Sequence, residues 1–203
     1  MIGAGNIGST LARHFTAAGH DVMLSNSRGP ETLTELVTEL GERAQAGTVE
    51  EAAGFGDLVV VAVPFKDYRT VPPDAVRGKV VIDAMNYYPQ RDGNFDELDS
   101  GATTSSELVA HHLQGAFVVK AFNTIRWDSL RDKAQLAAEG GHIGIPISGD
   151  DAAAKQEVDD LIAEIGFDGV DAGGLGEGGR KQQPGTAVYG TDLPSEELAE
   201  QIA

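Results

Sequence analysis

Three glycines near the start of the chain, Gly3, Gly5 and Gly8, form the pattern G-x-G-x-x-G. In such a turn the first glycine bends the backbone tightly, the second lets a pyrophosphate approach, and the third lets the next helix pack closely. The free N–H groups and the dipole at the start of that helix attract phosphates. A helix from about Asn6 to Gly19 and a strand over 21–25 are predicted to follow. This context favours a dinucleotide-binding loop over a glycine-rich turn without a ligand.

The strand that should precede this loop is almost absent, because only Met1 and Ile2 stand before Gly3. A strand in this position belongs in the middle of the sheet, and omitting it would leave its two neighbours unpaired. We therefore expect a chain that starts inside this strand, either because its natural start lies upstream or because it is truncated, rather than a native short form.

Apolar, β-branched runs alternate with helical patterns along the rest of the chain. Runs of this kind, ended by polar or turn residues, are typical of parallel strands buried on both faces. The strand predictions are residues 21–25, 57–64, 78–86, 116–123, 141–150 and 167–173. The alternation predicts an α/β fold, a doubly wound, mostly parallel sheet of the Rossmann type with helices on both faces. We assign residues 1–172 to this nucleotide-binding domain and residues 173–203, a loop and a short helix, to a C-terminal extension that completes the pocket or a dimer interface.

The residues at the end of the second strand distinguish NADP from NAD. NAD sites place an acid there for the ribose 2′-hydroxyl, and a carboxylate would repel a 2′-phosphate. This chain instead has hydroxyl, amide and guanidinium donors, which suit a phosphate: Ser25, Asn26, Ser27 and Arg28. The pattern favours NADP, and the alternative is a polar turn that caps the next helix.

Ligands of open α/β sheets bind beyond the carboxyl ends of the strands. The residues predicted to line such a cleft lie at the ends of three strands. They are Val63, Pro64 and Phe65 for the strand over 57–64, Ala84, Met85, Asn86, Tyr87 and Tyr88 for the strand over 78–86, and Ala121, Phe122, Asn123 and Thr124 for the strand over 116–123. A mostly apolar cleft with few polar groups suits a flat redox ring. For each residue the alternative is a role in loop packing. Asn86 and Asn123 are the most specific, because an amide just past a buried strand usually has a defined partner.

Composition excludes several functions. With 32 acidic residues against 15 Lys and Arg, the net charge of −17 disfavours nucleic acid and anionic membranes. The chain has no cysteine, and its five histidines show no metal-ligand spacing. No apolar run reaches the length of a membrane helix and no signal peptide is visible, so we expect a cytoplasmic protein.

The sequence also lacks the marks of common reductases. No Tyr-x-x-x-Lys pair is present, and only residues 173–203 follow the last predicted strand, whereas hydroxyacid and imino-acid reductases carry a substrate domain of roughly 100 residues or more. Binding of NADP without an evident acid, base or substrate domain suggests hydride transfer between two flat cofactors. In such a reaction the protein sets stacking and distance, and no catalytic side chain is needed.

Several motifs, taken together and in order, resemble the NADPH-dependent reductases of the 5-deazaflavin coenzyme F420. The resemblance covers nearly the whole chain and rests on GAGNIGSTLARHF, SNSRGPE, VVVAVPFKDY, VIDAMNYYPQRDG, VVKAFNT and SGDDAAAKQEVDDLIAEIGFDGVDAGGL. It implies an oxidoreductase that forms a compact homodimer and passes a hydride between NADPH and coenzyme F420. The segment GRKQQPGTAVYG departs from the family in having fewer aromatic and basic residues.

The resemblance also implies roles for particular residues. Gly3, Gly5, Asn6 and Ile7 would contact the pyrophosphate, Ser25, Ser27 and Arg28 the 2′-phosphate, and Val63 and Pro64 the nicotinamide. The deazaflavin would stack near Met85, Asn86 and Asn123, and its anionic tail would need a basic patch, for which Arg126, Arg180 and Lys181 are the candidates. Two alternatives remain open: a reductase that uses FMN or FAD, or that reduces metals through a flavin, and a non-catalytic NADP-binding sensor.

Overall fold

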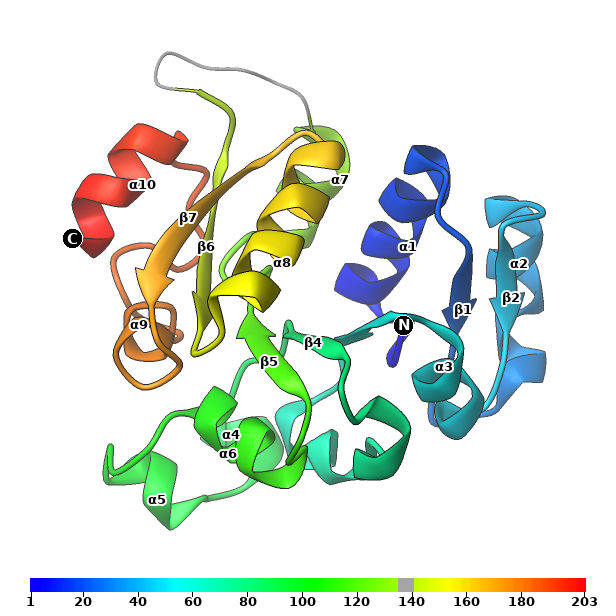
Figure 1. The fold of residues 1–203 in the computed structure, drawn as a ribbon, viewed down its shortest axis with the longest axis horizontal. Coiled ribbons are helices and arrows are strands. Elements are labelled where there is room, and N and C mark those ends of the chain that lie inside the picture. Colours follow the sequence, from blue (N-terminus) through cyan, green and yellow to red (C-terminus); the bar gives the residue numbers. More distant parts are fainter. Residues whose placement is uncertain (135–140) are drawn as a thin grey trace.

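The computed structural model describes residues 1–134 and 141–203, and its strands form an extended, mostly parallel array (Figure 1). The strands are β1 (Val22–Leu24), β2 (Ala44–Ala46), β3 (Leu58–Val61), β4 (Val80–Asp83), β5 (Phe117–Lys120), β6 (Gly144–Gly149) and β7 (Asp168–Gly173). β1 pairs with β2, and the other five follow one another in the order β3-β4-β5-β6-β7. All described pairs are parallel except β5 with β6.

The first residues of the chain join these two groups of strands. Ile2 forms parallel bridges to both Ser25 and Val61, with its N–H donating to Val60 O at 2.8 Å and its carbonyl accepting from Ala62 N at 2.8 Å. The resulting order places the amino-terminal segment between β1 and β3, in the middle of the sheet. This is the strand order of a doubly wound nucleotide-binding fold, so the predicted fold class is confirmed.

Helices cover both faces of the sheet. One face carries α1 (Asn6–Ala18), α2 (Thr34–Leu40), α7 (Trp127–Asp132) and α8 (Ala152–Glu164), and the other carries α3 (Val49–Phe55) and α6 (Ser105–His112). Short elements complete the described chain: 3-10 turns at Pro30–Leu33, Phe65–Thr70 and Pro73–Val76, and the helices α4 (Pro89–Asp92), α5 (Asp96–Asp99), α9 (Glu177–Lys181) and α10 (Ser195–Ile202). None of the described helices is long and apolar enough to cross a membrane.

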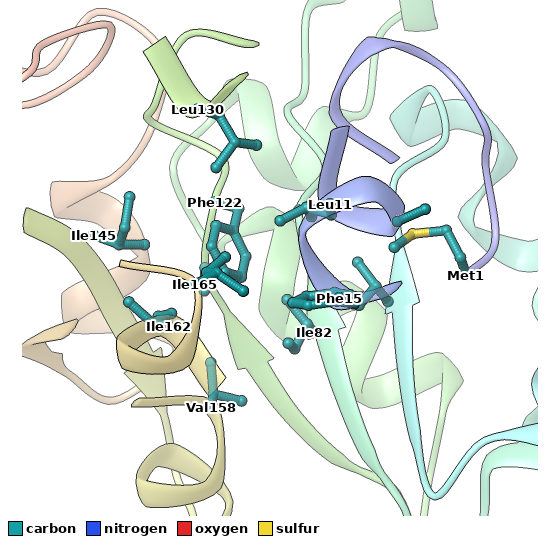
Figure 2. Close-up of a cluster of buried hydrophobic side chains, with 14 of the residues drawn as sticks. Met1, Leu11, Phe15, Ile82, Phe122, Leu130, Ile145, Val158, Ile162 and Ile165 are labelled. Atoms are coloured by element: carbon teal, nitrogen blue, oxygen red, sulfur yellow. The ribbon is translucent and has the colours of Figure 1, made fainter. Parts of the chain in front are cut away.

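Each face of the sheet has its own hydrophobic core. The first core packs α1 and α8 against the same face of the sheet, with Phe15, Ile82 and Ile162 buried together, and Figure 2 shows these side chains in one cluster. The second core contains Ile2 and Val81 with α3 and α6. Because Met1 belongs to the first core and Ile2 to the second, even this two-residue strand follows the alternation of a β-strand.

Local signals in the sequence agree with the elements observed. α1 ends at Gly19, which has the positive φ of +102° typical of a helix C-cap. A capping box begins α3, with Glu51 N donating to Thr48 Oγ1 and Thr48 N donating to Glu51 Oε2. The sequence pattern does not predict the short strand β2.

Residues after β7 pack back onto the sheet. α10 lies against β6 and β7, where Leu198 and Ile202 are buried with Ala172 and Val188. Lys181, at the end of α9, donates to the carbonyl of Ile202 at 2.7 Å. The C-terminal residues therefore form a small satellite core on the edge of the sheet that ends in β7 (Figure 1).

Candidate functional site

The glycine turn has the geometry that its pattern predicts. Gly3 adopts a φ of +102°, and a side chain there would collide with the carbonyl of Ala62, whereas a side chain on Gly8 would collide with the carbonyl of Gly3. A side chain on Gly5 would meet nothing within 4 Å. Gly5 is also the N-cap of α1, and no side chain caps the helix there. The first N–H groups of α1 therefore face open space in the position where a helix binds phosphate.

A cleft of about 670 Å³ opens beside this turn, along the carboxyl ends of β3, β4 and β5. It brings together nine of the predicted cofactor-binding residues, namely Gly5, Asn6, Ile7, Val63, Pro64, Ala84, Met85, Asn86 and Asn123. The reason is topological: parallel strands end at the same edge of the sheet, so loops distant in sequence meet there. The cleft is thus continuous from the phosphate-binding turn to the loop after β5.

Other predicted residues lie elsewhere. Ser25 is fully buried, and its hydroxyl donates to the carbonyl of Met1 at 3.4 Å. Asn26, Ser27 and Arg28 form a turn after β1, outside the lining of this cleft, in which Arg28 N donates to Asn26 Oδ1 at 2.9 Å. Ser27 and Arg28 are exposed there. The structure therefore leaves hydroxyl and guanidinium groups accessible at the end of β1 but turns the Ser25 side chain inward.

Two residues predicted to line the cleft are core residues instead. Phe65 is completely buried and stacks on Tyr68 with ring centroids 5.0 Å apart. Ala121 is completely buried in the opposite core. Each follows a strand end, but its side chain points away from the cleft, and neither lines it.

Two asparagines join the loops after β4 and β5. Asn86 Nδ2 donates to the carbonyl of Asn123 at 2.7 Å, and Asn123 Nδ2 lies 3.1 Å from Asn86 Oδ1 and 2.7 Å from the carbonyl of Gln182. These bonds tie both loops to the chain after α9. The specific partners expected of the two amides are therefore one another and a C-terminal segment.

The loop after β5 is held in an unusual backbone conformation. Phe122, between Ala121 and Asn123, has a φ of 63°, the only positive φ among the described residues that are not glycine. Its ring is fully buried, as Figure 2 also shows. A bulky residue in this region stores strain of about 1–3 kcal/mol, which the packed surroundings must offset. The strain lies at the wall of the cleft.

A buried ion pair lies directly beneath the loop after β4. Lys120 Nζ is 3.1 Å from Asp83 Oδ2 and donates to the carbonyl of Met85 at 3.0 Å. Asp83 accepts from Met85 N at 2.9 Å and from the hydroxyl of Ser106 at 2.6 Å. Lys120 is thus an ion-paired strand residue that does not itself line the cleft. Together the pair holds both backbone polar groups of Met85 and so positions the loop.

Two tyrosines meet in the cleft, Tyr88, which the sequence predicts there, and Tyr189, which it does not. The hydroxyls of Tyr88 and Tyr189 are in direct contact, and both residues line the cleft. Burial, and then the contact with Tyr88, raises the pKa of the Tyr189 phenol well above its usual value. Arg91 lies 4.9 Å from the centre of the Tyr88 ring and donates to the carbonyl of Asn86 at 2.6 Å. Local sequence carries no signal for this contact, because the two tyrosines are 101 residues apart.

The basic side chains in and near the cleft are mostly paired with neighbouring acidic side chains. Arg126 lines the cleft beside Trp127, whose side chain is 41% exposed, and donates twice to Asp128. Arg180 and Lys181 lie in α9 and do not line the cleft. The three basic residues named from the sequence therefore do not form one patch around this cleft.

Comparisons with known proteins find similar sequences and structures. A family described as NADP oxidoreductase, coenzyme F420-dependent, matches residues 1–87. A hypothetical protein from Sinorhizobium meliloti is 34% identical, with a TM-score of 0.82 over 95% of this chain and 93% of that one. A candidate F420-dependent NADP-reductase from Arthrobacter sp. FB24 is 24% identical, with a TM-score of 0.77 over 95% of this chain and 96% of that one. A pyrroline-5-carboxylate reductase from Coxiella burnetii shares the fold at 16% identity and a TM-score of 0.60, over 84% of this chain and 56% of that one.

Proposed function

We propose that the chain, whose residues 1–87 match the family of coenzyme F420-dependent NADP oxidoreductases, transfers a hydride between NADPH and a 5-deazaflavin bound side by side in the cleft. The coarser statement, that it is an NADP-dependent oxidoreductase, follows from the family itself. The observation that carries the finer proposal is the continuity of the cleft, from the uncapped start of α1 to the loops after β4 and β5.

The glycine turn and the turn after β1 would hold the nucleotide. Gly5, Asn6 and Ile7 offer backbone N–H groups to the pyrophosphate, with the dipole of α1 behind them. Ser27 and Arg28 are the exposed donors for the 2′-phosphate. Because the fully buried Ser25 bonds to the carbonyl of Met1, its hydroxyl supports the turn in this proposal and does not contact the phosphate.

The outer half of the cleft would position the second ring. Val63 and Pro64 form one wall near the nicotinamide, and the loops of Met85 and Asn123 form the other. When both cofactors are bound, the nicotinamide C4 and the deazaflavin C5 supply the hydride chemistry. The part of the protein is to fix distance and stacking, and the hydrogen bonds around Asn86 and Met85 limit the movement of that wall.

The C-terminal extension, residues 173–203, would complete this pocket. Tyr189 lines the cleft and contacts Tyr88, and the carbonyl of Gln182 accepts from Asn123. We propose this role for the extension together with the homodimer implied by the family resemblance. Sedimentation of the purified chain tests the dimer.

The decisive experiment follows NADPH oxidation by stopped-flow absorbance. The acceptors are coenzyme F420, FMN, FAD, or ferric iron together with a flavin. Rapid oxidation with F420 alone supports the proposal. Faster turnover with FMN or FAD would show that the second cofactor is an ordinary flavin and not a deazaflavin. Tight NADPH binding without oxidation by any acceptor would contradict hydride transfer and favour a sensor.

A further inference from the structure

Trp127 is an exposed aromatic side chain inside the cofactor cleft. Among the residues that the structure describes, the large apolar side chains that remain exposed are Phe55, Phe117 and Trp127. Of these, only Trp127 lines the cleft that runs from the glycine turn to the loops after β4 and β5. A single apolar residue on an open surface is common, but an indole on the wall of a cleft offers one of the largest apolar surfaces of any side chain to a ligand.

The support beneath Trp127 is rigid. Trp127 begins α7, which packs against α1 (Figure 1). In the same helix Leu130 is completely buried, with its carbonyl 2.7 Å from His14 Nε2, and Ser129 Oγ donates to Asp192 Oδ2 at 2.9 Å. These contacts fix the backbone that carries the indole. The ring is therefore held in place before a ligand arrives, which lowers the entropic cost of binding.

One face of the indole is already covered. The guanidinium of Arg131 lies over the ring, with its Cζ 4.8 Å from the ring centre, which is a cation–π contact. Arg131 also donates twice to Asp132, at 2.5 and 2.6 Å, so its charge is balanced within the helix. Although Arg131 covers one side of the ring, Trp127 remains 41% exposed. The remaining surface is available to a flat ligand in the cleft.

The wall around Trp127 is aromatic and carries little net charge. Tyr88 and Tyr189 line the same cleft, and their hydroxyls are in contact with one another. Arg126 and Asp128, on either side of Trp127, bond to each other at 2.8 and 3.1 Å. A lining that offers aromatic faces and polar groups that already have partners suits a planar, conjugated ring.

The contacts proposed for NADPH do not use Trp127. In that arrangement the start of α1 takes the pyrophosphate, the turn after β1 takes the 2′-phosphate, and Val63 and Pro64 lie near the nicotinamide. The indole is therefore left for the second substrate.

We propose that Trp127 is a stacking platform that binds the planar, conjugated ring of the second substrate, a deazaflavin or a flavin, within the cleft. This role rests on the proposed function for the placement of NADPH. The exposed part of the indole takes the ring, while Arg131 supports the indole on its other side. Trp127 contributes affinity for the ring and takes no part in the transfer of the hydride.

The test measures binding without turnover. Oxidised coenzyme F420 or FMN is titrated into the chain saturated with NADP⁺, so that no hydride can pass, and the fluorescence of the added ring gives its Kd. We expect Trp127→Ala to raise the Kd of the ring that the parent binds more tightly by roughly tenfold or more. Trp127→Phe should recover most of this loss, because it keeps an aromatic face.

Two controls accompany these variants. The Kd for NADP⁺, measured by calorimetry, should stay within about twofold of the parent in both, which also shows that they fold. Phe117→Ala is the matched control, because Phe117 is equally exposed but begins β5, at the end of the strand away from the cleft. It should leave both Kd values unchanged.

A second readout reports on the indole directly. Trp127 is the only tryptophan of the chain, so its indole N–H gives a single signal of that type in the NMR spectrum of the nitrogen-labelled chain. We expect this signal to shift when F420 or FMN is added to the NADP⁺ complex.

An unchanged Kd for both rings in Trp127→Ala, or no binding of either ring to the parent, would overturn the proposal. An equal loss of NADP⁺ affinity would contradict it by assigning the indole to the first cofactor. An indole signal that shifts with protein concentration and not with either ring would contradict it by assigning Trp127 to an interface between two copies of the chain. If a ring binds through Trp127 but NADPH is not oxidised, the proposed hydride transfer fails while the stacking role stands.

Discussion

Single residues in the phosphate-binding turn have separable duties. A side chain at Gly8 would collide with the backbone of Gly3, whereas a side chain at Gly5 would enter open space. Gly8 therefore serves folding of the turn, and we propose that Gly5 serves ligand access.

Alanine substitutions should separate these duties. We expect Gly5→Ala to leave Tm within about 1 °C of the parent but to raise the Kd for NADPH roughly tenfold or more, equivalent to about 1.4 kcal/mol. Gly8→Ala should lower the free energy of unfolding by about 1–3 kcal/mol because the turn is overpacked. Gly54→Ala is the matched control: its side chain also meets nothing within 4 Å, and it should not affect NADPH binding. Melting curves and fluorescence titration measure both effects, and a large loss of Tm in Gly5→Ala would contradict this division.

Arg28 should determine the preference for the 2′-phosphate. Its side chain is exposed in the turn after β1, and a charge-assisted bond contributes about 1.5–3 kcal/mol. We expect Arg28→Ala to weaken NADPH binding by roughly 10- to 150-fold and to change NADH binding little. Arg77→Ala, which removes an exposed guanidinium paired with Asp74, is the control. Equal losses for NADPH and NADH would contradict the assignment.

Elements of the sheet position the cleft through contacts made below it. The carboxyl end of β4 and the carboxyl end of β5 are joined by the Asp83–Lys120 pair, both of whose side chains are almost completely buried. This pair connects two strands and also fixes the loop after one of them. A substitution in this pair should therefore change the stability of the sheet.

Removing one member of this pair leaves the other charged and buried. We expect Lys120→Met to lower the free energy of unfolding by about 3–5 kcal/mol. The double variant Lys120→Met with Asp83→Asn should recover part of the loss, since the uncompensated charge is gone. Urea unfolding of the parent, both single variants and the double variant measures this coupling. Strict additivity would contradict a direct interaction.

The stability of the whole molecule should depend on pH through the amino terminus. The pKa of the Met1 amine is lowered to about 5 in the folded chain, so between pH 8 and pH 5 the unfolded chain binds a proton that the folded chain does not. Stability is then complete above pH 8 and falls as the pH drops through this window, by up to about 4 kcal/mol. Below pH 5 both states are protonated and this loss is complete.

Acetylation of the amine should remove this dependence. Urea unfolding of the free and acetylated chains at pH 5 and pH 8 measures it, and the difference between the chains isolates the amine. The other titratable groups that line the cavity beside Met1 are the same in both chains: His20, Asp21, Asp57, Glu157, Asp160 and Glu164. The same pH dependence in both chains would show that the amine is not responsible.

Much of the fold was determined by the sequence alone, because the signals are local. Gly3 and Gly8 need a close backbone approach, Thr48 and Glu51 cap one helix within four residues, and buried strands read as apolar runs. The doubly wound, mostly parallel sheet follows from these runs through general rules of α/β topology, although they do not include β2. The nine predicted cofactor-binding residues that line the cleft could be identified from the sequence for the same reason. Each lies in the glycine turn or near the end of a strand.

Only the tertiary structure decided the contacts between distant segments. The inward turn of Ser25, the bond from Asn123 to Gln182 and the contact of Tyr88 with Tyr189 depend on how loops from different units meet. The Asp83–Lys120 pair likewise arises where strands far apart in sequence lie side by side. Periodicity and spacing describe one segment at a time, and the free energy of these contacts exists only after the segments have packed together.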